Sequence, residues 1–305
     1  MAISAKTTLT FLGYACELGT SHEGAAAGPQ HFIQSKPFQR LQSLIGEIDC
    51  LMPSAKAHGL EAAPLLQEIN TELAKKTDLL IRQGQPFVTI GGDHTSAIGT
   101  WSGASTALAE QGDLGLIWFD AHMDSHTPTS THSGNIHGMP LAVLLGYGDP
   151  QLTAVHSPRP KIKAERVCLI GVRSFEAEEE ALLKSLNVRI FFMKEIEERG
   201  IAAILADALT IATTGTAGFG ISFDLDVIDP TEAPGVGTPA PKGLPIAPLI
   251  AALKAWNHHP LLVGLEIVEF TPILDEDDRT TTIIADIIEA IWGTRGVNDE
   301  RQRNY

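Results

Sequence analysis

Three short polar stretches of the chain hold side chains that bind metal ions in proteins, and each follows an apolar run. They are Gly91–Thr95 (GGDHT), Asp120–His126 (DAHMDSH) and Ser222–Asp226 (SFDLD). Together they supply two imidazoles and at least four carboxylates, which are enough to hold two divalent cations side by side. Because two such cations activate water, these residues predict a metal-dependent hydrolase.

The spacing within the stretches directs several ligands to one point. Asp120, His122 and Asp124 are alternate residues, and alternate side chains of an extended segment project to the same side. The same holds for Asp224 and Asp226. A lone Asp-x-Asp pair is usually a loop or helix-cap feature. Three motifs together favour a metal site, since bound cations offset the desolvation and repulsion of clustered carboxylates.

The chemical types of these ligands indicate which metal they would hold. Carboxylates and imidazoles without thiolate favour Mn²⁺, with Fe²⁺, Co²⁺, Ni²⁺ and Zn²⁺ less favoured. Since one carboxylate can bridge two ions, five or six ligand residues suffice for a binuclear centre. A water bridging the ions would have a lowered pKa and form hydroxide near neutral pH. We therefore expect two Mn²⁺ per subunit, with other divalent transition metals as alternatives.

Two further regions could contact a substrate. The loop His126–Gly138 is dense in hydroxyls, amides and imidazoles, and most histidines in such a loop are capping residues. His137 is the exception, because a histidine beside a metal site at the start of a helical segment can shuttle protons. Glu266 and Glu269 follow an apolar run and would otherwise be surface charges or helix caps. Glu269 could hold a planar cation by paired charge-assisted hydrogen bonds.

The elements that must position these residues alternate between strands and helices. Near-continuous apolar strands in this order predict a parallel sheet covered on both faces. Ligands of such sheets bind beyond the carboxyl ends of the strands, where all three motifs lie. The predicted strands are 87–90, 114–119, 167–170, 189–192, 219–223 and 261–267, and the predicted helices are 60–83, 96–110, 141–145, 177–186, 196–211, 247–256 and 280–291.

Composition limits the organisation and partners of the chain. No linker or repeat interrupts the 305 residues, so we expect one catalytic domain spanning 1–305. The formal charge of −15 argues against nucleic acid and anionic membranes, which need clustered Lys and Arg. No apolar run reaches the ~20 residues that cross a bilayer. Cys16, Cys50 and Cys168 form no paired motif, which is typical of a reduced cytoplasmic protein.

The three motifs, in this order between Phe87 and Pro272, together with Gly235–Pro239 (GVGTP), resemble the ureohydrolase superfamily. This superfamily includes arginases, agmatinases, guanidino-acid hydrolases and formimidoylglutamases. The resemblance implies a three-layer α/β/α fold around a mostly parallel sheet, a two-manganese centre and a homo-oligomer, often a trimer or hexamer. It implies that one ion is held by His94, Asp120, Asp124 and Asp224, and the other by His122, Asp226 and the bridging Asp120 and Asp224.

The stretch Thr131–Pro140 (THSGNIHGMP) is most similar to the arginase branch. That likeness implies hydrolysis of L-arginine to L-ornithine and urea, with a small cationic guanidino compound as substrate. It implies that Glu269 binds the guanidinium and that Asp226 accepts or passes on a proton. His137 would relay a proton to the leaving amine. Ser133, and with it Asn135, would contact an amino-acid substrate, Ser133 at the α-carboxylate.

Two positions depart from the arginase pattern, and both fall among the residues that recognise the amino acid. His126 stands where arginases commonly carry a carboxylate-binding asparagine, and Glu176 stands where they carry an aspartate near the substrate amino group. Agmatine, a guanidino acid, guanidine or formimidoylglutamate are therefore alternative substrates. A catalytically silent metal-binding paralogue and a one-zinc amidohydrolase of the deacetylase type are less favoured, because both histidine ligands and Asp226 are present.

Overall fold

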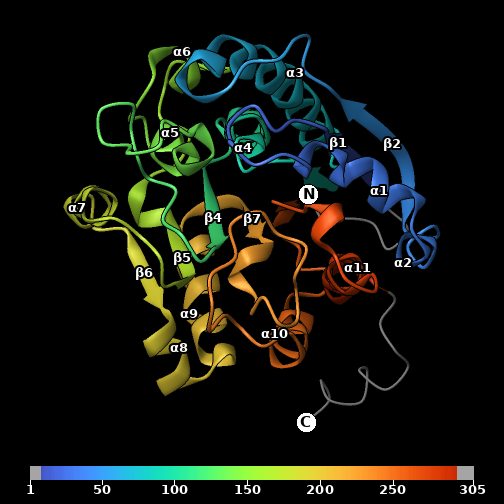
Figure 1. The fold of residues 1–305 in the computed structure, drawn as a ribbon. Helices are drawn as coiled ribbons and strands as arrows, with labels where there is room; N and C mark the ends of the chain where they lie inside the picture. Colours follow the sequence, from blue (N-terminus) through green and yellow to red (C-terminus); the bar gives the residue numbers. More distant parts are fainter. Residues whose placement is uncertain (1–7, 294–305) are drawn as a thin grey trace.

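A computed structural model describes residues 8–293 of the chain, which are built around one eight-stranded sheet (Figure 1). Every neighbouring pair of strands is parallel. In spatial order the strands are β2 (Ile45–Leu51), β1 (Leu9–Tyr14), β3 (Phe87–Gly91), β8 (Leu262–Val268), β7 (Thr216–Asp224), β4 (Asp113–Phe119), β5 (Val167–Val172) and β6 (Arg189–Phe192).

The strands are apolar on both faces because both faces are covered by helices. In β4, Leu116 and Trp118 pack into one hydrophobic core, while Ile117 and Phe119 pack into the other. Helices α3 (Ala63–Arg82), α4 (Ser96–Leu108) and α5 (Pro140–Leu144) cover the first face. Helices α9 (Ile201–Thr213), α10 (Ile246–Leu253) and α11 (Arg279–Trp292) cover the second. Figure 1 shows these groups above and below the sheet, which confirms the predicted three-layer α/β/α fold.

Close packing of α3 on α4 needs a residue without a side chain at the contact. A Cβ built on Gly103 would lie 2.1 Å from the backbone oxygen of Ala74. Only glycine therefore lets the two helices approach this closely. This contact matters for the site because α4 begins directly after the Gly91–Thr95 motif.

The structure differs from the sequence prediction in three respects. β1 and β2 were not among the predicted strands. The predicted helix 196–211 is two helices, α8 (Met193–Arg199) and α9, because Gly200 has φ 80° and ψ 144°, outside the helical region. The predicted helix 60–83 begins as a 3₁₀ turn over Gly59–Ala62. The shorter helices are α1 (Gly28–Gln34), α2 (Lys36–Gln39), α6 (Pro150–Thr153) and α7 (Ala177–Ser185).

The sheet order brings the chemically active segments together. The four strands β3, β8, β7 and β4 are consecutive neighbours in the sheet. Their carboxyl ends lead into the segments that contain His94, Glu269, Asp226 and Asp120. Four segments separated by as many as 175 positions along the chain therefore meet at one edge of the sheet.

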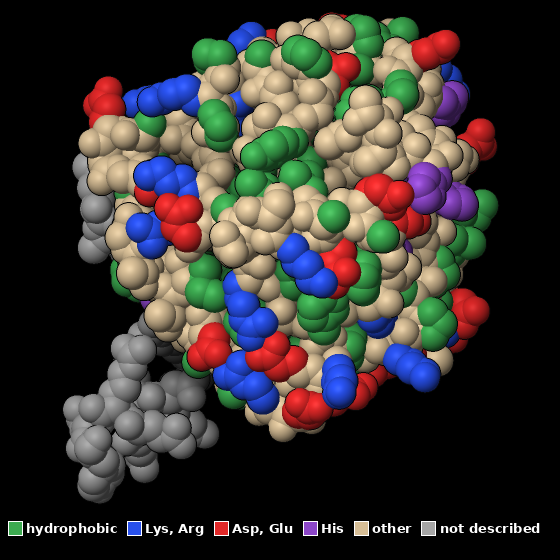
Figure 2. Space-filling view, turned by 90° about the vertical axis from the view of Figure 1, so that its left-hand side faces the viewer, with side chains coloured by type: hydrophobic (Ala, Val, Ile, Leu, Met, Phe, Trp, Pro, Cys, Tyr) green, Lys and Arg blue, Asp and Glu red, His purple; other side chains and the backbone are tan. Residues whose placement is uncertain are grey.

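The outer surface carries charges of both signs on the face seen in Figure 2. There, Lys and Arg side chains lie beside Asp and Glu side chains, and this face has no continuous basic area. Within residues 8–293, no helix combines the length and the apolar character needed to pass through a membrane.

Candidate active site

Two groups of metal-ligating atoms lie at the carboxyl edge of the sheet. Nδ1 of His94 lies 2.9 Å from Asp124 Oδ2, 3.2 Å from Asp224 Oδ2 and 3.4 Å from Asp120 Oδ2. Nδ1 of His122 lies 2.9 Å from Asp226 Oδ2 and 3.5 Å from Asp120 Oδ1. The two oxygens of Asp120 thus face different groups. All six residues predicted as metal ligands are brought together at these two points.

The arrangement fits a pair of divalent cations. Among the described residues, His94 Nδ1 and Asp124 Oδ2 are buried, and although they lie 2.9 Å apart neither makes a hydrogen bond of suitable geometry. Buried polar atoms are normally paired, so two unpaired ones aimed at the same point indicate a place for an ion. Asp224 belongs to the His94 group in this geometry, since its Oδ1 accepts the backbone N–H of Asp226 at 2.9 Å. The carboxylate that both groups share is Asp120.

The electrostatics of the ligands also call for cations. Burial and the charges of Asp226 and Asp120 raise the pKa of Asp224 well above its ordinary value. Burial and the charge of Asp120 raise the pKa of Asp124 to about 6. Burial alone would lower the pKa of His122, but the carboxylates of Asp226 and Asp120 outweigh it and raise that pKa. Divalent cations would replace these protons and hold the carboxylates ionised.

The His94 ring is oriented by a buried chain of hydrogen bonds. Its Nδ1 faces the carboxylates, so Nε2 is the donor, to Ser222 Oγ at 3.0 Å. Ser222 in turn donates to Glu266 Oε2 at 2.9 Å. Glu266 is fully buried and also accepts from Ser96, Thr100 and Trp101 at 2.7–3.0 Å. Such a chain fixes the tautomer and the direction of a metal-binding histidine.

The indole of Trp118 supports both metal groups. Its Nε1 donates to Asp120 Oδ2 at 2.9 Å. Its ring stacks on that of His94, with centroids 4.3 Å apart and an angle of 12° between the planes. Trp118 lies on β4 and is fully buried. Trp118 therefore orients His94 and the carboxylate that both groups share.

Two candidate residues have a left-handed backbone, which is uncommon outside glycine. Asp124 has φ 47° and Glu269 has φ 64°. Such conformations cost of order 1–3 kcal/mol and persist only where surrounding contacts enforce them. At Glu269 one such contact is the backbone N–H, which donates to the Gly92 carbonyl at 2.8 Å. The backbone thus turns the Glu269 side chain back toward the Gly91–Thr95 motif.

The Glu269 carboxylate is paired with His137. Its Oε1 accepts from the His137 ring at Nδ1 over 3.0 Å and from the backbone N–H of His94 over 2.8 Å. Burial disfavours the charged ring, but the charge of Glu269 outweighs burial and raises the pKa of His137 to about 9. The ring therefore carries its second proton, and with it a positive charge, at neutral pH. The backbone N–H of His137 donates to the Gly19 carbonyl at 3.0 Å, and Gly19 donates to the buried Asp93 at 2.6 Å.

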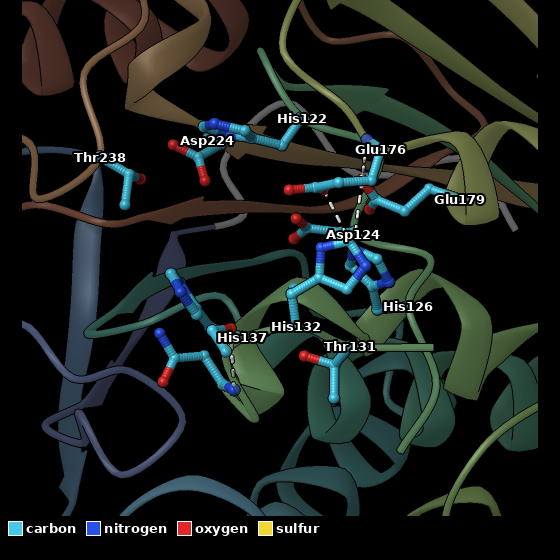
Figure 3. Close-up of a pocket in the computed structure, with 13 residues that line it drawn as sticks. His122, Asp124, His126, Thr131, His132, His137, Glu176, Glu179, Asp224 and Thr238 are labelled. Atoms are coloured by element: carbon cyan, nitrogen blue, oxygen red, sulfur yellow. Dashed lines mark hydrogen bonds and ion pairs between the residues drawn. The ribbon is translucent and has the colours of Figure 1, made fainter. Parts of the chain in front are cut away.

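A pocket of about 160 Å³ opens above the two metal groups (Figure 3). Its inner wall includes His122, Asp124 and Asp224, and its outer wall includes His126, Ser133, Asn135 and Glu176, so all the predicted substrate residues except Glu269 line it. Glu269 is almost fully buried and lies behind His137, which does line the pocket. Both of the hydrogen bonds that the Glu269 carboxylate accepts fall on Oε1, so within the described residues Oε2 is the oxygen left for a further ligand.

Four residues at the site were not singled out from the sequence. Glu179 and Thr238 line the pocket, and Thr238 donates to Asp226 Oδ2 at 3.3 Å. Asp93 and Ser222 are fully buried and hold the loops and rings described above. Asp93 and Ser222 lie inside two of the three metal-ligand motifs, and Thr238 lies inside Gly235–Pro239. Their positions within these motifs could have identified them as site residues. Glu179 lay in a run of glutamates, which gave no such signal.

Comparison with known proteins places this geometry in a family. The sequence profile of the arginase family matches residues 7–293. An arginase of Bacillus caldovelox is 34% identical over 297 residues, which cover 94% of this chain and 98% of that protein. The crystal structure of an arginase from Bacillus cereus superimposes with a TM-score of 0.88 at 31% identity, covering 95% of this chain and 100% of the other.

A more distant structure shares the fold alone. The formimidoylglutamase of Bacillus subtilis superimposes with a TM-score of 0.75 at 22% identity, and the match covers 94% of this chain and 87% of the other. The profile match and the identity to arginases carry the assignment, since both extend over nearly the whole chain. The chain therefore belongs to the arginase family, and it is a hydrolase that acts on C–N bonds in linear amidines.

Proposed function

We propose that the chain is a binuclear manganese arginase that hydrolyses L-arginine to L-ornithine and urea. The observation that carries the proposal is the pair of ligand groups that share Asp120 at the base of a pocket. The proteins that the chain resembles at 31–34% identity bear the name arginase. Oxygen and imidazole ligands without a thiolate support Mn²⁺ as the metal.

We assign the ions to these residues by their positions. His94, Asp120, Asp124 and Asp224 would hold one ion, and His122, Asp226 and Asp120 would hold the other. When bound, two divalent cations would supply Lewis-acid activation of water and stabilise negative charge in the transition state. Among the described residues, only Asp120 offers one oxygen to each of the two histidines, so replacing it should affect both ions.

The protein's own residues would bind the substrate and move protons. Glu269 would hold the guanidinium, and the His137 ring beside it would carry its proton to the leaving amine. Asp226 would receive a proton through Oδ2, which lies 2.9 Å from His122 Nδ1 and accepts a hydrogen bond from Thr238. Each of these groups lies within or directly behind the pocket wall.

The direct test is release of urea from L-arginine by the purified protein after incubation with Mn²⁺. Replacing Asp120 with Asn should lower turnover by at least about 100-fold, because a bridging ligand and its charge are lost. A folded Asp120→Asn variant with wild-type turnover would contradict the assignment.

One observation favours a second candidate substrate class within the same reaction. Arginases commonly carry a carboxylate-binding asparagine at the position of His126. Here the His126 side chain is instead hydrogen-bonded to Glu176 at the pocket mouth. A substrate without an α-carboxylate, such as agmatine, would fit this mouth. Urea release from agmatine that exceeds release from arginine would support this alternative.

Other properties stay predictions. We expect a homo-oligomer, a trimer or hexamer, in the cytoplasm, with no nucleic acid or membrane as partner and with the chain acting as one catalytic domain. Sedimentation of the purified protein with and without Mn²⁺ tests the oligomer.

A further inference from the structure

We propose that His126 is a positioning residue: it holds the Glu176 carboxylate across the pocket mouth to receive a substrate ammonium group. The substrate carboxylate, if one is present, binds instead to Ser133 and Asn135, which also line the pocket. This inference deepens the proposed function and rests on it, since it concerns the end of the substrate remote from the guanidinium.

The His126 ring has no spare donor or acceptor to offer a substrate. Its Nε2 lies 3.0 Å from Glu176 Oε2 and its Nδ1 lies 3.1 Å from Ser130 Oγ. A ring that donates at Nε2 and accepts at Nδ1 satisfies both contacts. The backbone N–H of His126 donates to the Gly138 carbonyl at 3.0 Å, and only 10% of the side chain is exposed. The ring is therefore held in place as a support for Glu176.

Glu179 is also occupied, although it completes a third cluster with His126 and Glu176. Its Oε1 accepts from the backbone N–H of Ser125 at 3.2 Å, and its Oε2 accepts from the backbone N–H of Glu176 at 3.0 Å. Its side chain is 4% exposed. Glu179 thus ties the segment after the metal ligand Asp124 to the first turn of α7. We infer that this cluster is a structural bridge and not another metal site.

Glu176 is the member of the cluster that a ligand can reach. It precedes α7, lines the pocket and has 51% of its side chain exposed. Figure 3 shows it on the same side of the pocket as His126, joined to it by the dashed contact. A half-exposed carboxylate that accepts a single ring N–H has room to pair with an ammonium group. Glu176 is therefore the group that distinguishes substrates with an amine from those without one.

Another part of the pocket lining supplies donors suited to a carboxylate. Ser133 and Asn135 both line the pocket. Ser133 Oγ accepts the backbone N–H of Asn135 at 3.2 Å, so its hydroxyl hydrogen can be donated to a ligand. Asn135 Nδ2 contacts Ser21 Oγ at 3.3 Å, and its amide has a second hydrogen. Ser133 and Asn135 can therefore both donate to a substrate carboxylate.

Three substrates of equal length test the assignment. Arginine carries both an ammonium and a carboxylate, agmatine lacks the carboxylate, and 5-guanidinopentanoate lacks the ammonium. His126→Ala should lower kcat/KM roughly 10-fold or more for arginine and agmatine, mainly through KM, and change it less than about twofold for 5-guanidinopentanoate. Glu176→Gln should give the same pattern. Ser133→Ala should instead weaken arginine and 5-guanidinopentanoate and spare agmatine.

Two further variants keep the test decisive. His126→Gln retains a donor near the place of Nε2 and should restore most of the loss seen with alanine. Thr129→Ala, an exposed change in the same loop, should leave all three substrates unchanged. If His126→Ala fails to fold, Ser130→Ala, which removes the partner of Nδ1, should show a weaker form of the same pattern.

The outcomes separate this inference from the proposed function. A His126→Ala enzyme that loses arginine and 5-guanidinopentanoate but keeps agmatine would show that His126 binds the carboxylate, which overturns the inference. An equal loss on all three substrates would overturn it as well. A wild-type enzyme that is active only on 5-guanidinopentanoate would overturn the inference about His126 but would leave the assigned reaction, hydrolysis of a guanidino C–N bond, intact. A wild type that releases urea from none of the three overturns both.

Discussion

Glu269 and His137 are joined by a hydrogen bond of 3.0 Å between Oε1 and Nδ1, although 132 positions separate them along the chain. Glu269 is 3% exposed and His137 forms the pocket wall in front of it. The ring therefore stands at the pocket wall beside Oε1 and leaves Oε2 for another ligand. In the proposed function, the guanidinium binds the Glu269 carboxylate next to the His137 ring, which is then placed to pass on its proton.

This relationship predicts the effect of removing the charge of Glu269. In Glu269→Gln the amide cannot balance a buried guanidinium, so kcat/KM for arginine should fall by about 100-fold or more. The same change on the exposed surface of α8, Glu198→Gln, should have no effect. Steady-state kinetics of the two Mn²⁺-loaded variants measure both. Equal kinetics in the two would remove Glu269 from the substrate site.

The His137 proton predicts a pH dependence of stability in the metal-free protein. The folded-state pKa of about 9 lies above the ordinary histidine pKa of about 6.5. The pairing therefore stabilises the fold fully below pH ~6.5, and this stabilisation is lost as the pH rises through ~9. A shift of this size corresponds to at most about 3 kcal/mol.

Urea denaturation of the metal-free wild type and of His137→Phe at pH 6 and pH 9.5 measures this contribution. The difference in unfolding free energy between the two proteins should shrink toward the higher pH. A difference that stays constant between the two pH values would mean that the ring is neutral in the folded state.

The chain from Glu266 through Ser222 to His94 predicts metal affinity. In Glu266→Gln the amide group is itself a donor, so it cannot accept from all four of its present partners. The orientation of His94 should loosen, and Mn²⁺ affinity should fall about 10- to 100-fold. Thr100→Val is the matched control, because it removes a contact to Oε1 and leaves the Ser222 contact to Oε2 intact.

Calorimetric titration of the metal-free proteins with Mn²⁺ gives the affinity and the number of ions bound. Glu266→Gln should bind one of its two ions more weakly, while Thr100→Val should resemble the wild type. An equal loss of Mn²⁺ affinity in both variants would show that the effect comes from a general disturbance of the buried cluster and not from the orientation of His94.

Much of the fold could be predicted because the central strands are apolar on both faces. The ends of β3, β4 and β7 were visible as polar motifs after apolar runs. β2 was not, because it is an edge strand with largely exposed residues, including Glu47 and Ile48. Its pairing with β1 depends on the sheet beside it and leaves little trace in local pattern.

The functional site could likewise be predicted from the sequence only in part. The six metal ligands lie in short motifs, so their convergence followed from strand ends and alternate spacing. Glu266 is the contrary case, since from sequence alone it read as a surface charge or cap. Its burial depends on Ser96, Thr100 and Trp101, which meet it only because α4 packs against β8. The pairing of His126 with Glu176 likewise joins segments 50 positions apart.

The most direct test of the account is the stoichiometry of products from L-arginine, measured with the purified chain at two equivalents of bound Mn²⁺. We predict urea and ornithine in equal amounts, at a rate that falls when Mn²⁺ is removed and returns when it is restored. A folded protein that binds two Mn²⁺ and releases no urea from arginine would contradict the account.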